Sequence, residues 1–66
     1  MFTNTELSKL IFSMEIGSYF QVSGLHYQLL EKGFSENNDC TVYEFERGKV
    51  YRLPAYTCAR VCERVD

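Results

Sequence analysis

Residues 40–53, CTVYEFERGKVYRL, carry the pattern that decides the predicted fold. Residues that favour strands lie on both sides of Arg47-Gly48, a pair that favours a turn. Four large apolar residues of this stretch stand at odd positions: Tyr43, Phe45, Tyr51 and Leu53. The stretch therefore predicts a β-hairpin with these four side chains on one face.

The register of this hairpin follows from the shared face. Opposed residues must then have numbers that add to an even value, which requires a loop with an odd number of residues. We predict a three-residue loop, Glu46-Arg47-Gly48, with Phe45 opposite Lys49. Gly48 is expected to be left-handed, because glycine is usual at the third position of such a loop.

Residues 4–15 carry the signals of an α-helix. Thr3 and Glu6 have the spacing of a capping box, and Phe2 and Leu7 have the spacing of a hydrophobic staple. Apolar residues then recur at helical spacing, and a glycine follows that can end the helix.

The next segments predict a strand, a helix and a loop. Residues 18–22 are rich in strand formers, with Phe20 and Val22 on one face. Residues 24–32 follow a serine that can cap a helix and precede a glycine that can end one. Residues 35–39 contain turn formers and no apolar residue, so they predict a loop.

The tail after Pro54 allows two structures. Cys58, Val61, Cys62 and Val65 match a helical stripe, which favours a helix over residues 55–65. Thr57, Ala59 and Val61 also alternate, which would suit a strand. The predicted fold is a single α+β domain over residues 1–66, with the order helix, strand, helix, β-hairpin and C-terminal helix or strand.

Composition is that of a small globular protein. The chain is 45% hydrophobic and 24% charged with a net charge of −2, and a domain of this length can build only a thin core. It has neither the roughly 20-residue apolar run of a membrane span nor the layout of a signal peptide. We expect a cytoplasmic protein without membrane contact, with Cys40, Cys58 and Cys62 reduced.

Catalytic and metal-binding patterns are weak. His26 is the only histidine, and no spacing pairs it with a nucleophile, so we expect a non-enzymatic protein with no catalytic residues. In a helical tail, Cys58 and Cys62 would lie one turn apart and could share a zinc ion, but the remaining ligands are missing. We therefore predict no metal and no cofactor, and interpret the cysteines as small buried hydrophobes.

Aromatic content gives the functional hypothesis. Five phenylalanines and five tyrosines are more rings than so thin a core can hold, and tyrosine is enriched in protein interfaces. We expect a protein-binding module, by analogy a small inhibitor or adaptor of the kind carried by phages or mobile elements, with a homodimer as one form of partner. The residues expected to contact the partner are Tyr19, Tyr43, Tyr51, Tyr56, Arg47, Lys49 and Arg52.

The alternative hypothesis is a small DNA-binding transcriptional regulator. The hairpin tip after two predicted helices resembles the arrangement of a winged helix, with Lys32, Arg47, Lys49 and Arg52 on phosphates. The predicted second helix offers one sure cation, and the chain lacks the basic excess usual in such domains. Nucleic acid is therefore the less favoured partner.

Overall fold

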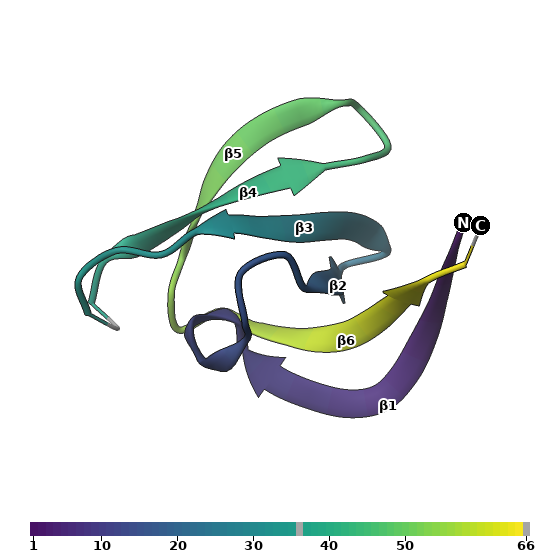
Figure 1. The fold of residues 1–66 in the computed structure, drawn as a ribbon, viewed down its shortest axis with the longest axis horizontal. Helices are drawn as coiled ribbons and strands as arrows, with labels where there is room; N and C mark the ends of the chain where they lie inside the picture. Colours follow the sequence, from purple (N-terminus) through teal and green to yellow (C-terminus); the bar gives the residue numbers. More distant parts are fainter. Residues whose placement is uncertain (36, 66) are drawn as a thin grey trace.

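The computed structural model describes residues 1–35 and 37–65, and nearly all of its regular structure is β-strand (Figure 1). Six strands form one antiparallel sheet in the order β1-β6-β2-β3-β4-β5. One short 3-10 helix, η1, follows the first strand. The elements are β1 (Phe2–Leu10), η1 (Ile11–Ser13), β2 (Tyr19–Val22), β3 (Leu25–Glu31), β4 (Asp39–Glu44), β5 (Lys49–Pro54) and β6 (Cys58–Arg64). The predicted α+β class is wrong, because the described residues contain no α-helix.

The helix predicted over residues 4–15 is replaced by β1 and η1. β1 pairs with β6 at both of its ends, and the register shifts between Asn4 and Ser8. At this irregularity the hydroxyl of Thr5 donates to the carbonyl of Val61 at 2.9 Å. A helix cap contributes only about 1 kcal/mol, so the long-range pairing with β6 outweighs the local signal.

The helix predicted over residues 24–32 is also wrong, because this segment forms β3 between β2 and β4. Leu25, Tyr27 and Leu29 alternate with polar residues and point to the interior. This alternation, with a period of two, is the pattern of a strand. The helical spacing appeared only because Leu30, which is exposed, was grouped with the interior residues. The winged-helix alternative therefore lacks the helix that would enter a DNA groove.

The tail forms a strand rather than the favoured helix. β6 is inserted between β1 and β2 and pairs with both. Because β6 has a neighbouring strand on each side, the sheet satisfies its backbone hydrogen bonds. The sequence pattern that indicates this strand is the alternation of Thr57, Ala59 and Val61. Ala59 and Val61 belong to the interior.

Two predicted elements are confirmed. The strand expected over residues 18–22 is β2, and Phe20 and Val22 share its interior face. The hairpin expected over residues 40–53 is β4 and β5. Of the expected loop over 35–39, Asp39 already belongs to β4, and position 36 lies outside the described residues.

The predicted hairpin register is wrong. Glu44 pairs with Lys49, so the loop has four residues, 45–48, and opposed residues add to an odd number. Tyr43 therefore lies opposite Val50, on the other face from Tyr51. The prediction fails at Glu44. This side chain is charged but fully buried, so it lies on the core face, where the predicted alternation has an outward-facing residue. Gly48 is left-handed as predicted, with φ +65°.

The core lies on one face of the sheet, here called the core face. Its buried residues come from the four strands β2, β3, β4 and β6, from η1 and the residue after it, and from the β5–β6 turn: Ile11, Met14, Phe20, Tyr27, Leu29, Cys40, Val42, Ala55 and Ala59. Backbone N–H groups of Ile11 and Phe12 donate to Thr57 and Ala55, at 3.0 and 3.2 Å. These bonds hold η1 against the β5–β6 turn at the left of Figure 1.

The opposite side of the sheet, here called the second face, is bent over at one end. The rings of Phe2 on β1 and Phe45 after β4 have centroids 5.0 Å apart, although β6, β2 and β3 lie between those strands. In a flat sheet, four strand spacings would separate β1 from β4 by about 19 Å. The sheet therefore curls toward the second face where β1 begins, as the long curve of β1 in Figure 1 indicates.

Candidate functional site

One row of paired residues crosses the second face from edge to edge. Successive strand pairings place its six members side by side: Asn4, Cys62, Tyr19, Gln28, Tyr43 and Val50. Amide and tyrosine side chains alternate along the middle of this row. They combine hydrogen-bonding groups with flat apolar surface, which suits a recognition surface.

An aromatic cluster lies at the curled end of the second face. It consists of half-buried residues from β1, β2, β3, β4 and the β4–β5 loop: Phe2, Tyr19, His26, Tyr43 and Phe45. Phe2 stacks on the His26 ring at 4.8 Å, and Phe45 meets Tyr43 edge-on at 4.9 Å. The Arg64 guanidinium lies 5.6 Å from the centre of the Phe45 ring. The rings hold each other in place while part of each stays accessible to solvent.

His26 is fixed at the rim of this cluster by Glu46. Its Nδ1 lies 2.6 Å from Oε2 of Glu46, and its backbone N–H donates to Oε1 at 2.8 Å. The hydrogen bond from the His26 side chain lowers the pKa of the Glu46 carboxyl, so this group stays ionised in mild acid. The pair ties the β4–β5 loop to the start of β3.

Three arginines share the second face with the rings. Arg60 and Arg64 lie on β6 at the same side as Cys62, and Arg52 lies on β5 at the same side as Val50. Each of these three arginines is exposed. Guanidinium groups beside aromatic rings favour ligands that present carboxylate or phosphate groups.

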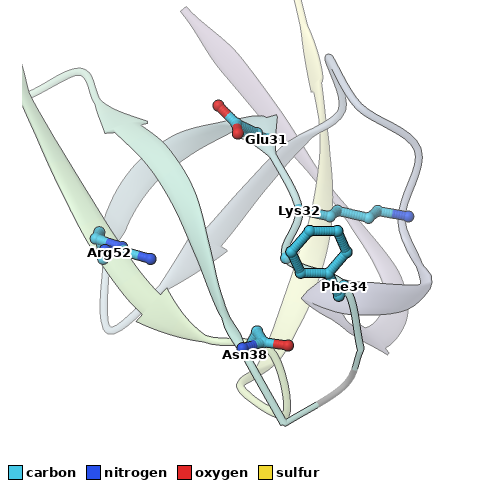
Figure 2. Close-up of a pocket in the computed structure, with 6 residues that line it drawn as sticks. Glu31, Lys32, Phe34, Asn38 and Arg52 are labelled. Atoms are coloured by element: carbon cyan, nitrogen blue, oxygen red, sulfur yellow. The ribbon is translucent and has the colours of Figure 1, made fainter.

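A hollow of about 410 Å³ opens at the opposite end of the second face (Figure 2). A register shift between Leu29 and Glu31 turns Glu31 to this face, in line with Thr41 and Arg52. Figure 2 shows Arg52 reaching in from β5 on one side and Phe34 standing on the other, with Asn38 below them. The volume is in the range of small-ligand sites.

The wall opposite Arg52 carries a fully exposed ring. Phe34 is 104% exposed. Asn38 is tied to Ser35, because its Oδ1 accepts hydrogen bonds from the backbone N–H and the hydroxyl of Ser35, both at 3.1 Å. A Cβ on Gly33 would lie 2.3 Å from the Cβ of Asn38, so only glycine fits there. Lys32 points out of the hollow, with its Nζ 5.5 Å from the centre of the Phe12 ring.

A buried acidic group underlies the β4–β5 loop on the core face. Oε2 of Glu44 accepts a hydrogen bond from the backbone N–H of Arg47. Its Oε1 lies 3.4 Å from Nε of Arg47, an ion-pair contact without hydrogen-bond geometry. Burial raises the pKa of Tyr27, and the negative charge of the paired Glu44 adds to the rise. This group holds the loop shape that presents Phe45.

The three thiols are free and lie in different environments. Cys40 and Cys62 are buried, while Cys58 is exposed on β6. The thiol of Cys62 donates to Oδ1 of Asn4 at 2.9 Å. Burial raises the pKa of Cys40 and of Cys62, and a raised pKa disfavours the thiolate that reacts or binds metal. Within residues 1–35 and 37–65, no three His, Cys, Asp or Glu side chains gather as a metal site.

The structure brings together only some of the residues predicted to bind a partner. Tyr19 and Tyr43 belong to the aromatic cluster, and Arg52 lines the hollow. The others are spread over β5 and the turns at its two ends. Tyr51 packs against the core, Arg47 lies in the loop, Lys49 begins β5, and Tyr56 is exposed in the β5–β6 turn.

Sequence reasoning missed the remaining members of the surface. The sequence predicts a helix staple at Phe2 and a helix over the segment that contains His26, although both residues stand on strands. The alternation of Leu25, Tyr27 and Leu29 with polar residues was the available signal for His26. Nothing in the local sequence marks Phe2, because its position depends on the pairing of β1 with β6.

Neither membrane topology nor similarity to known proteins adds to this description of the site. The described part of the chain contains no helix with the length and apolar character needed to cross a bilayer. Comparison with protein-family models, with curated proteins and with solved structures finds no match to this chain.

Proposed function

We propose that this protein is a non-enzymatic protein-binding module whose partner covers the second face. The observation that carries this proposal is the aromatic cluster, in which five half-buried rings from separate elements are held in contact and left partly accessible. Rings that are already ordered lose little entropy on binding, and they supply much of the energy of protein interfaces.

The size of the surface suits this role. A standard protein interface buries about 800 Å² of each partner, which is less than a fifth of the 4404 Å² accessible surface of this chain. One face of the sheet therefore provides enough area. The cluster, the row of amides and tyrosines, and the hollow adjoin one another along β4, so a single partner can contact all three.

Single-stranded nucleic acid is the second candidate, favoured by the exposed Arg52, Arg60 and Arg64 on the same face as the rings. Two features weigh against it. The net charge is −2, and the Phe45 ring meets Tyr43 edge-on at an interplanar angle of 83°, whereas base stacking needs ring faces that are open to the ligand. We therefore favour a protein partner.

Site-directed photocrosslinking in cells that express the protein naturally tests the proposal. A photoreactive phenylalanine analogue is placed at Val50, which lies opposite Tyr43 at the end of the row and is 59% exposed. The control carries the same analogue at Tyr56. Tyr56 is 70% exposed and lies past the far end of β5 from the aromatic cluster. The control is therefore at least as accessible but lies off the proposed surface.

The expected result is a protein adduct from position 50 that is absent or weaker from position 56. An adduct of twice the monomer mass would identify a second copy as the partner. An adduct destroyed by nuclease would support the nucleic-acid candidate instead. Equal adducts from both positions, or none from position 50, would contradict a role for the second face.

A further inference from the structure

The two edges of the sheet differ in regularity. β1 forms one edge, and its pairing with β6 is interrupted between Asn4 and Ser8. β5 forms the other edge, and its six pairs with β4 run without interruption from Asp39↔Pro54 to Glu44↔Lys49. An edge strand has backbone N–H and C=O groups that face outward, and a regular edge is a template for another strand. β5 is therefore the edge suited to accept one.

Charge determines which strand β5 can accept. Residues 49–54 contain Lys49 and Arg52 and no acidic residue, and both cations are exposed. A second copy of β5 would bring the same two cations to the shared edge, and like charges on paired strands are destabilising. A strand with acidic side chains is instead attracted by both residues.

The hollow gives one acidic side chain a defined place. Arg52 lies on the second face of β5 and lines the hollow, with Phe34 opposite it (Figure 2). Side chains of a strand added to β5 alternate between the two faces. One on the second face beside Arg52 can reach the guanidinium with its carboxylate, in the bidentate geometry that arginine favours, while its methylene groups approach the Phe34 ring.

We propose that β5 binds an extended acidic segment of a protein partner as a seventh strand, with one Asp or Glu side chain entering the hollow to pair with Arg52. The inference rests on the proposed function in assuming a protein partner. It adds the conformation of the bound segment, its charge and the residue that anchors it.

A displayed library of random twelve-residue peptides tests this binding mode. The library is selected on the intact protein, and the bound pool is compared with the pool selected on Arg52→Glu. Arg60→Glu is the matched control, because it changes the net charge equally at an exposed second-face position on β6. Nuclear magnetic resonance spectra of the backbone amides confirm that each variant is folded.

We expect peptides rich in Asp and Glu among strand-forming residues. Arg52→Glu should weaken their binding roughly tenfold or more, as expected for loss of a charged hydrogen-bonded pair, and Arg60→Glu about fivefold or less. Glu31→Gln should strengthen binding, because it removes a like charge from the wall of the hollow. Binding without acidic enrichment, an empty pool, or equal effects of the two arginine variants would overturn the proposal.

Backbone N-methylation tests the added strand itself. Two versions of a selected peptide carry N-methyl groups at odd or at even residues, so that each removes one of the two alternating sets of N–H donors. One set faces β5 and the other faces solvent, so one version should lose binding and the other keep it. Loss or retention by both versions would contradict strand addition. Crosslinking from Val50 that persists after such a failure would leave the proposed function intact and reject only this binding mode.

Discussion

The carboxylate of Glu46 holds His26 at two points, with Oε2 2.6 Å from the imidazole Nδ1 and Oε1 2.8 Å from the backbone nitrogen. The contact joins residues 20 positions apart. It links the β4–β5 loop, which carries Phe45, to the strand that carries the stacked His26–Phe2 pair. The geometry of the aromatic cluster therefore depends on an ionisable contact.

Acid should weaken this contact. The hydrogen bond from His26 lowers the pKa of Glu46 in the folded state, so its contribution to stability is present above the unfolded value near 4.3 and is lost as pH falls through the lower folded value. Glu46→Gln should reduce the loss of unfolding free energy between neutral pH and pH 3, measured by urea denaturation. Glu63→Gln, at an exposed position on β6, is the control. Identical pH profiles for the wild type and Glu46→Gln would contradict this role.

Glu44→Ala should destabilise the fold by about 1–3 kcal/mol, because it removes a buried acceptor from the backbone N–H of Arg47 and leaves a gap beside Tyr27. Urea denaturation measures the loss. Glu44→Gln keeps the shape and removes the charge, so it should lower the pKa of Tyr27, followed by ultraviolet absorbance. An unchanged Tyr27 titration in a folded Glu44→Gln variant would show that burial alone causes the shift.

The thiols should differ in reactivity. Cys58 is exposed, while Cys40 and Cys62 are buried with raised pKa values. A thiol-specific reagent at neutral pH should modify Cys58 rapidly in the native protein, and the other two only after unfolding. Mass spectrometry counts and locates the adducts. Rapid native modification of Cys62 would show that burial and the hydrogen bond to Asn4 do not protect this thiol.

Gly48→Val should cost about 1 kcal/mol or more, because a β-branched residue is strongly disfavoured at a φ of +65°. Gly48→Asn should cost less, since asparagine tolerates the left-handed region. Thermal denaturation of both variants checks the order. Equal stabilities would indicate that the loop changes its conformation to accommodate the new side chain.

Local sequence signals predicted those parts of the fold that depend on neighbouring residues. The β4–β5 hairpin and the strand over 18–22 were recognisable, because their turn residues and strand formers are adjacent in sequence. β1 was not recognisable from local signals. Thr3 and Glu6 have the spacing of a helix cap, but pairing with β6, more than 50 residues away from them, outweighs this local preference. The hairpin register failed at Glu44, because polarity suggested a solvent position and the side chain is buried.

The candidate site was predictable only in its chemistry. An excess of rings pointed to an aromatic surface, and Tyr19 and Tyr43 do lie in the cluster. Tyr51 faces the core because the register differs from the one assumed. Phe2 and Phe45 meet only through the curl of the sheet, and the hollow depends on a register shift in β3. Such features arise from tertiary structure and leave no periodic mark in the sequence.

The position of β6 between β1 and β2 has a consequence for biosynthesis. β2, β3 and β4 are each paired with the next strand in sequence, so the four strands from β2 to β5 can pair through short connections alone. β1 and the free side of β2 must wait for β6, the last of the six strands to leave the ribosome. The closure of the sheet is thus a late, long-range step that should limit the folding rate, and until then the nascent chain exposes two unpaired edges that a chaperone can recognise.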